Sequence, residues 1–495
     1  MKGAGGRLLK QSGLYALGNA AIKAGGLVLL LFYLDPALLT QAEYGRLVLL
    51  ETAASLAVVL AGLGLAQGLL KYGTDPAFAD ERDALGFTTF VVSAGLAAAL
   101  WIVAALLSPL LAGWLLDSGE RAAIIRLAAA YAALKVVAAV PYMTLRMDER
   151  AGWYVVGLVV EFSVLLGGVY YFLVAQRMGL EGAMWGFVCS AGAAAVFLGG
   201  GLLAQGRWRF RRRLVRRLLA FGAPLTFAGL ANVLLNTGDR FLLDAFDGAE
   251  AVAVYGLAQK FGGLVNMLFV QSFSMAFAVL GLKALGSLAA DAGGEVGNLH
   301  RRTFRHFAVL TGWGVLGVSL LAFDVTAWVS PNPAYLQADP LILPVAFGFM
   351  AYGIYYIMMN VLYATAQTGR IAGNVLGAAL FNLALNAVLI PLLGAMGAAL
   401  ATLAAYAGLA AVTAWQARRA VVIAFPWAAL AAVVALVAGL WALGQPALGW
   451  TQPVRLGWRL ALIVAYPPLV FAAGVYSREE VRVTWAAVRA YFGRS

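Results

Sequence analysis

The sequence predicts an all-α, polytopic membrane protein of about fourteen transmembrane helices, and three observations predict this fold class. Apolar stretches of about twenty residues, each long enough to cross a bilayer, follow one another from Ser12 almost to the C-terminus. The chain of 495 residues is 63% hydrophobic and 12% charged, and its mean hydropathy is +0.85; soluble domains are far more polar. The polar segments between the stretches are too short to hold a soluble catalytic domain.

Each predicted span is an apolar stretch bounded by polar or basic residues. The first span is too long for a signal peptide and lacks a small-residue cleavage site, so we interpret it as an uncleaved helix. The spans are residues 12–34, 44–70, 84–107, 122–145, 152–174, 182–204, 218–243, 251–280, 303–328, 339–362, 371–390, 396–415, 424–444 and 457–476.

Lysine and arginine gather on one side of this helix array. The net charge is +12, and the positive-inside rule explains this excess better than nucleic-acid binding does. If the N-terminus is cytoplasmic, most cations fall in cytoplasmic segments, including seven arginines between Arg207 and Arg217. An even number of spans with both termini cytoplasmic follows. The opposite face keeps Arg46, Arg121, Arg177, Arg455 and Arg459.

Short sequence matches indicate an internal repeat. Tyr44-Gly45 and Tyr255-Gly256 open the second and eighth spans, and Gly-Ala-Met at 182–184 and 394–396 opens the sixth and twelfth. The common offset predicts two parallel six-helix bundles followed by two additional helices. The predicted organisation is therefore an N-terminal lobe at 1–206, a basic cytoplasmic linker at 207–217, a C-terminal lobe at 218–419, and two helices with a cytoplasmic tail at 420–495.

Several ionisable residues fall inside the predicted spans, where charge is costly and usually faces a cavity or a partner. The cations outnumber the acids, which predicts a positively lined, hydrated cavity that attracts an anion such as pyrophosphate. The predicted substrate-binding residues are Lys23, Lys135, Arg240 and Lys260. The acids with a predicted coupling or ion-pair role are Glu51, Glu161 and Asp239.

Structural alternatives stay open for most of these residues. Glu51 can tether two helices, Glu161 can pair with a lysine of the same half, and Asp239 with Arg240 can form a purely structural ion pair. Arg126 lies close enough to a span end to extend to the interface. The asparagines in the spans can line a sugar site or join helices by hydrogen bonds.

The sequence carries no motif for covalent chemistry. Neither a metal-ligand cluster, nor a phosphate-binding GxxxxGK[ST] loop, nor a GxSxG nucleophile elbow occurs. The single cysteine, Cys189, excludes an internal disulfide. We therefore expect no enzyme activity, no catalytic residue, no metal, no cofactor and no nucleic-acid partner.

Two stretches resemble the polysaccharide (O-antigen type) flippase family of the multidrug/oligosaccharidyl-lipid/polysaccharide exporter superfamily. The first runs from Asn236 through Asp239-Arg240 to Leu243 and continues from Gly248 to Lys260; the second is Thr40-Gln41-Ala42-Glu43-Tyr44-Gly45. The chain length and the helix count fit this resemblance along the whole chain.

The resemblance implies a flippase that moves a polyprenyl-pyrophosphate-linked oligosaccharide from the inner to the outer leaflet by alternating access. The expected pathway is lipopolysaccharide or exopolysaccharide synthesis in the cell inner (cytoplasmic) membrane, with membrane lipids, a polysaccharide polymerase and chain-length proteins as partners. A lipid II flippase and a cation-coupled drug exporter of the same superfamily are alternatives. A membrane glycosyltransferase or polymerase is disfavoured because no large outer loop is present.

Overall fold

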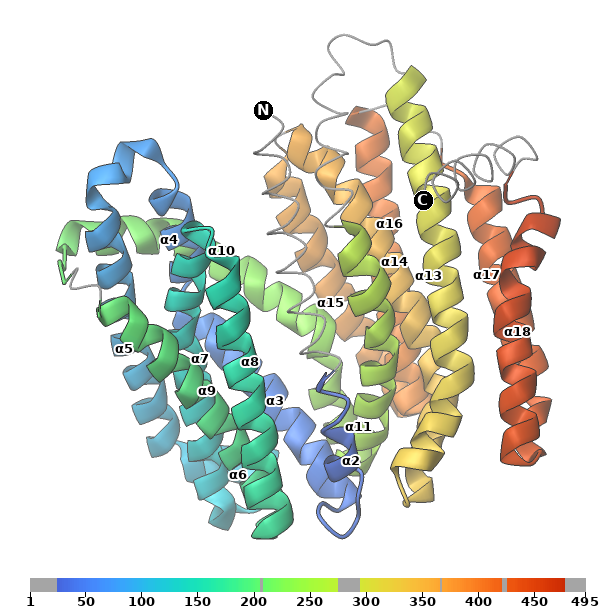
Figure 1. Cartoon of the computed structure of the whole chain (residues 1–495), viewed down its shortest axis with the longest axis horizontal. Helices are drawn as coiled ribbons and strands as arrows, with labels where there is room; N and C mark the ends of the chain where they lie inside the picture. The colour runs from blue at the N-terminus through green and yellow to red at the C-terminus, as the bar shows by residue number, and fades with distance from the viewer. Residues whose placement is uncertain (1–24, 205–207, 275–293, 366, 421–424, 477–495) are drawn as a thin grey trace, which may run out of the picture. The chain divides into compact units, whose positions relative to one another are not determined.

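The computed structural model describes residues 25–204, 208–274, 294–365, 367–420 and 425–476 (Figure 1). Within these ranges every regular element is a helix, which confirms the all-α prediction. Twelve segments of the described chain are long and apolar enough to cross a membrane. One of them, Arg212–Ser274, covers the predicted span 218–243 and the described part of the predicted span 251–280. Most of the predicted span 12–34 lies outside the described residues.

The chain divides into two compact units. The first unit comprises residues 1–257, 329–337 and 375–405, and the second comprises 258–328, 338–374 and 406–495. The helices are, in order, α2 (Leu30–Tyr33), α3 (Gln41–Gly62), α4 (Leu65–Gly73), α5 (Arg82–Leu106), α6 (Ser108–Leu115), α7 (Ala122–Met147), α8 (Ala151–Val169), α9 (Gly179–Leu203), α10 (Arg212–Thr237), α11 (Asp239–Val265), α13 (Gly294–Val329), α14 (Asp339–Ala364), α15 (Thr368–Leu393), α16 (Ala395–Ala420), α17 (Trp427–Gly444) and α18 (Gln452–Ala472).

The prediction of one continuous span over residues 44–70 is wrong. Residues 44–70 form two helices, α3 and α4, because Leu63 and Gly64 both adopt left-handed backbone conformations, with φ of 42° and 61°. Glycine tolerates this conformation at low cost. The break packs against Gly222 of α10, where a Cβ atom on Gly222 would lie 2.2 Å from the Leu63 carbonyl oxygen. Because Gly222 has no side chain, the backbone of α10 can contact the backbone of the α3–α4 break.

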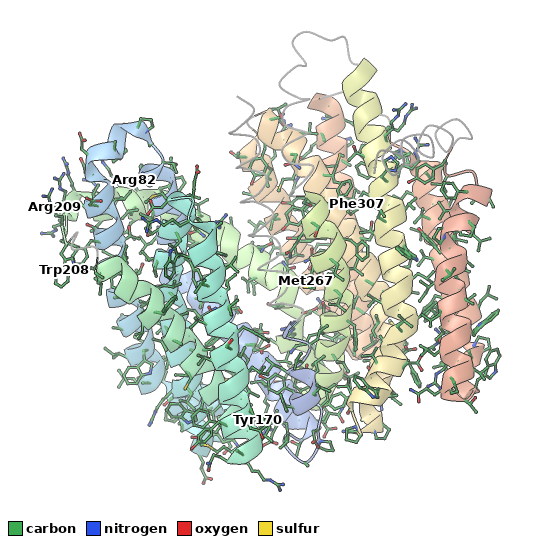
Figure 2. All side chains as sticks on the ribbon, viewed as in Figure 1. Arg82, Tyr170, Trp208, Arg209, Met267 and Phe307 are labelled. Atoms are coloured by element: carbon green, nitrogen blue, oxygen red, sulfur yellow. The ribbon has the colours of Figure 1, made fainter. Side chains whose placement is uncertain are left out.

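Helix α7 is the centre of the first unit. It lies beside α5 on one side and α9 on the other, and it also contacts α3 and α4 (Figure 1). Small side chains let membrane helices approach closely, and five alanines of α7 are buried: Ala128, Ala129, Ala132, Ala133 and Ala138. Arg82, Trp208 and Arg209 lie at one end of the unit and Tyr170 at the other (Figure 2).

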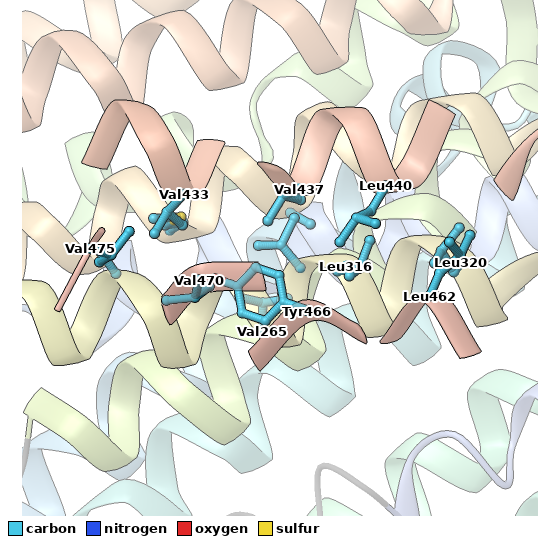
Figure 3. Close-up of a cluster of buried hydrophobic side chains, with 14 residues drawn as sticks. Val265, Leu316, Leu320, Val433, Val437, Leu440, Leu462, Tyr466, Val470 and Val475 are labelled. Carbon is cyan, nitrogen blue, oxygen red and sulfur yellow. The ribbon is translucent and has the colours of Figure 1, made fainter. Parts of the chain in front are cut away.

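The second unit has a continuous apolar core along α13, α17 and α18 (Figure 3). Val433 and Val437 of α17 pack with Leu316 of α13 and Tyr466 of α18. Tyr466 is fully buried, and its hydroxyl donates a hydrogen bond to the Val309 carbonyl oxygen at 3.0 Å. A tyrosine is tolerated in an apolar core when its hydroxyl has such a partner. The two C-terminal helices α17 and α18 are thereby packed onto α13.

Candidate functional site

Lys135 and Glu161, both predicted from the sequence, form an ion pair in the first unit. Lys135 lies near the middle of α7, and its Nζ atom is 2.5 Å from Oε1 of Glu161 on α8. The second carboxylate oxygen, Oε2, accepts a hydrogen bond from the Tyr142 hydroxyl at 3.0 Å. The Lys135 ammonium also lies 6.0 Å from the centre of the Tyr131 ring. Of the structural alternatives for Glu161, pairing with a lysine of the same half is the one observed.

The pair lines an open cavity of about 430 Å³. One face of α7 and one face of α8 form its walls, since the lining residues recur every three or four positions. The start of α4 closes the third side. The lining residues are Ala66, Gln67, Lys135, Ala139, Tyr142, Met143, Arg146, Tyr154, Leu158, Glu161, Phe162 and Leu165.

The cavity combines charge with aromatic surface. Arg146 lies on the same face of α7 as Lys135, three helical turns away, so two cations line one wall. Tyr142 and Tyr154 contact each other edge to face, with ring centroids 5.1 Å apart. The Lys135 and Glu161 side chains are 33% and 16% exposed, so each charge reaches the open space of the cavity. An incoming anion can therefore compete with Glu161 for Lys135.

Arg240, another cation of the predicted set, is located in the first turn of α11. Its Nη1 atom donates a hydrogen bond to Thr52 Oγ1 of α3 at 3.0 Å. Its Nε atom is buried and has no hydrogen-bond partner. Arg240 does not line the cavity that contains Lys135.

Asp239 precedes Arg240 and is fully buried. Its Oδ2 atom accepts hydrogen bonds from the Tyr255 hydroxyl and from Thr402 Oγ1, the latter at 3.1 Å. Its Oδ1 atom has no hydrogen-bond partner. Asp239 is thus held by hydroxyl groups of α11 and α16, while Arg240 bonds to α3.

Neither Glu51 nor Lys260 lines the Lys135–Glu161 cavity. Glu51 is half-buried on α3, within electrostatic range of the Tyr33 and Tyr131 phenols. Lys260 is half-buried on the part of α11 that belongs to the second unit. Lys23 lies outside the described residues.

The sequence interpretation missed a buried charge cluster in the second unit. It placed Arg455 and Arg459 on the face opposite the basic segments and named no partner for them; both are buried in α18. Arg455 Nε and Arg459 Nη1 contact the two carboxylate oxygens of Asp324 on α13, at 2.8 and 3.0 Å. The spacing of four residues on one helix face, together with a lone aspartate in an apolar helix, was the available signal.

A family of known proteins matches the N-terminal half of the chain. The model of the family described as "Polysaccharide biosynthesis protein" matches residues 8–278, which is more than half of the sequence. This chain belongs to the polysaccharide biosynthesis protein family. No curated protein sequence matches it significantly.

Several solved transporter structures share the fold of this polysaccharide biosynthesis protein. The lipid II flippase MurJ in an inward closed conformation superposes with a TM-score of 0.74 at 12% identity, covering 94% of this chain and 100% of that one. An inward-facing MATE family transporter of the MOP superfamily gives 0.63 at 15% identity, covering 82% and 94%. A MOP superfamily transporter from Pyrococcus furiosus, described as having a binding pocket of reverse polarity, gives 0.59 at 14% identity, covering 83% and 95%. The chain is thus a multi-span membrane protein with the MOP superfamily fold.

Proposed function

We propose that this protein is a flippase that moves a polyprenyl-pyrophosphate-linked oligosaccharide from the inner to the outer leaflet of the cytoplasmic membrane. Membership in the polysaccharide biosynthesis family supports the oligosaccharide. A fold that superposes on a lipid-linked substrate flippase along 94% of the chain supports the transport step. The observation that carries the proposal is the open cavity beside the Lys135–Glu161 pair at the middle of two membrane-spanning helices.

The cavity suits a headgroup that carries both phosphate and sugar. Lysine binds phosphate oxygens by charge-assisted hydrogen bonds, and Lys135 can exchange Glu161 for a pyrophosphate oxygen while Tyr142 still donates to Glu161. The Tyr154 ring and the Gln67 amide offer stacking and hydrogen bonds to a sugar. Since Glu161 replaces the pyrophosphate as the substrate leaves, the Lys135 ammonium is never without a partner.

The other predicted residues act in the same transport cycle. Lys23, Arg240 and Lys260 engage the anionic headgroup as it passes between the predicted lobes, which alternate access by rocking. Asp239 is the candidate for ion coupling. Its buried Oδ1 atom has no hydrogen-bond partner, so a bound cation or proton would satisfy it. Glu51 and Glu161 remain ion-pair or coupling acids. No covalent step is needed, so we assign no catalytic residue and no cofactor.

The distribution of charge supports an orientation with both termini in the cytoplasm. Arg82 and Arg209 share one end of the first unit (Figure 2), and the linker arginines Arg211 and Arg213 contact Glu81 at that end. Basic residues remain on the cytoplasmic side of a membrane. With this orientation we expect a polysaccharide polymerase and chain-length proteins as partners, as the resemblance implies.

A flipping assay in proteoliposomes tests the function. The purified full chain is reconstituted with a fluorescent polyprenyl-pyrophosphate oligosaccharide, and outward movement is followed by quenching from outside. We expect Lys135→Gln to slow flipping about tenfold, equivalent to one lost charge-assisted hydrogen bond. The matched control is Lys71→Gln, since Lys71 lies on α4 over the Phe221 ring and outside the cavity. No flipping by the wild-type protein would overturn the proposal.

The same assay separates the alternatives. A lipid II flippase would move lipid II in preference to other lipid-linked oligosaccharides. A drug exporter would move an organic cation, for which the cations Lys135 and Arg146 make the cavity wall unfavourable. Preference for either of these substrates over the oligosaccharide lipid would reassign the function within the fold.

A further inference from the structure

A second hollow of the first unit lies at its basic end, between α5, α7, α8 and α9. Its larger part, of about 420 Å³, is lined by Pro141, Thr144, Leu145, Asp148, Arg150, Trp153, Phe197, Leu198, Gly201 and Leu202. A smaller part, of about 70 Å³, adds Arg82, Asp83, Gly86, Phe87, Met147 and Trp208. Thr144, Asp148 and Leu202 line both parts, so the two are continuous. We refer to this hollow as the α7–α9 groove; it shares no lining residue with the Lys135 cavity.

One end of the groove is apolar. Its lining runs along α7 from Asp148 back to Pro141, which is about 10 Å of helix. Trp153 of α8 and Phe197 of α9 form its rim with ring centroids 6.3 Å apart, and they are 57% and 40% exposed. Both helices are membrane spans, so this end faces lipid chains rather than water.

The other end of the groove carries two cations and two anions. Arg82 and Asp148 are 3.7 Å apart, with side chains 42% and 27% exposed. Arg82 also donates to the Met147 carbonyl oxygen at 3.3 Å. Asp83 and Arg150 complete the set. The charges of the lining therefore balance, which matches a zwitterionic ligand better than an anionic one.

The two helix ends that border the groove favour ligand groups of opposite charge. Asp148 caps the C-terminus of α7, where both the carboxylate and the last carbonyl groups favour a cation. Arg150 is the N-cap residue of α8, whose first turn contains no acidic residue, so this position favours an anion. A headgroup with a phosphate next to a primary ammonium has the same order of charges.

We propose that the α7–α9 groove binds a bilayer phospholipid with a phosphoethanolamine headgroup. Arg150 holds its phosphate, Asp148 accepts hydrogen bonds from its ammonium, and one acyl chain occupies the space between Trp153, Phe197 and Gly201. Choline lacks the N–H donors that Asp148 needs, and phosphoglycerol lacks the cation. This site is independent of the proposed transport substrate.

Two adjacent glycines of α9 provide a matched pair of variants. Gly201 lines the groove, whereas Gly200 does not. A Cβ atom on either glycine would meet no other atom within 4 Å, so a larger side chain causes no clash at its first carbon. Gly201→Leu fills the groove and Gly200→Leu leaves it open.

Native mass spectrometry of the purified full chain measures the binding. The protein is titrated with phosphatidylethanolamine, phosphatidylcholine or phosphatidylglycerol of identical acyl chains. We expect the wild type and Gly200→Leu to retain phosphatidylethanolamine about tenfold more tightly than the other two lipids. Gly201→Leu should lose this retention, and Asp148→Asn should bind phosphatidylethanolamine and phosphatidylcholine equally.

Three results would overturn the proposal: equal retention of all three lipids by the wild type, preference for phosphatidylglycerol, or unchanged retention in Gly201→Leu. Photo-crosslinking provides a test that needs no variant. Phosphatidylethanolamine with a photoreactive acyl chain should label the segment 197–202 of the wild type. Labelling only elsewhere in the chain would place the lipid at another site and would contradict the assignment.

Discussion

Arg459 of α18 donates from Nη1 both to Oδ2 of Asp324 at 3.0 Å and to the Leu320 carbonyl oxygen at 2.9 Å, and its side chain is fully buried. Arg455 contacts the other oxygen of the same carboxylate. Breaking a buried pair leaves an uncompensated charge and costs about 3–5 kcal/mol. This contact therefore secures α18 to α13.

Replacing Arg459 should destabilise the protein severely. We expect Arg459→Gln to lower the free energy of unfolding by about 3 kcal/mol, since Asp324 loses one of its two arginine partners. Thermal unfolding in detergent measures the change. The matched control is Arg370→Gln, because Arg370 is exposed and surface changes cost about 0.5 kcal/mol or less. Equal stability of the two variants would argue against a role for the cluster in anchoring α18.

The two members of the Lys135–Glu161 pair should have opposite effects on substrate binding. Glu161→Gln removes the competitor of the pyrophosphate for Lys135, so we expect affinity for the lipid-linked substrate to rise about tenfold. Lys135→Gln should lower it by a similar factor. Binding to the purified protein can be measured by fluorescence anisotropy. If both variants weaken binding equally, the pair has only a structural role.

The stability of the same pair gives an independent measurement. Each single glutamine variant leaves one charge without its partner, whereas the double variant leaves none. We expect a coupling energy of about 1–3 kcal/mol in the double-mutant cycle. Unfolding of the four proteins under one condition measures it, and additive effects would mean that the two side chains do not interact.

Asp239 should be needed for coupling rather than for folding. Asp239→Asn preserves the side-chain shape and can still accept from Tyr255 and Thr402 through its carbonyl oxygen. We expect flipping to persist and its response to an imposed Na⁺ or H⁺ gradient to disappear. The control is Asp244→Asn, about one and a half turns further along α11. A gradient response that survives in Asp239→Asn would exclude this carboxylate as the coupling group.

The contact of α10 with the α3–α4 break should not accept a side chain. We expect Gly222→Ala to cost about 1–3 kcal/mol, because the new Cβ atom would lie 2.2 Å from the Leu63 carbonyl oxygen. Gly95→Ala on α5 is the control, since its Cβ atom would meet nothing within 4 Å. That variant should be neutral or more stable by up to about 1 kcal/mol. Thermal unfolding compares them, and equal losses would indicate a propensity effect instead of a clash.

Much of this architecture could be predicted because membrane spans depend on composition and length. Residues such as Ala128 and Ala132 make α7 apolar along most of its length, and a bilayer allows few structures other than a helix there. The break at Leu63–Gly64 was not predictable in the same way. Leucine has no preference for a left-handed conformation, so the break depends on the tertiary contact with Gly222.

The candidate site was predictable only in its residue types. An ammonium at mid-span must have a partner or a cavity, and Lys135 has both. Its choice of Glu161 depends on how α7 rotates against α8, which no local pattern specifies. The burial of Arg455 and Arg459 was not predicted, because arginines near a span end usually extend toward the interface. Asp324, far away in the sequence, holds them inside.

The break between α3 and α4 has an electrostatic consequence for the cavity. Helix α4 starts at Leu65, so Ala66 and Gln67, which line the cavity, belong to its first turn. The backbone N–H groups of a first turn have no acceptor within their own helix, and together they carry a partial positive charge. A diphosphate that reaches Lys135 therefore also approaches oriented peptide dipoles, and these persist in every side-chain variant. We accordingly expect charge removal at Lys135 to weaken anion capture without abolishing it.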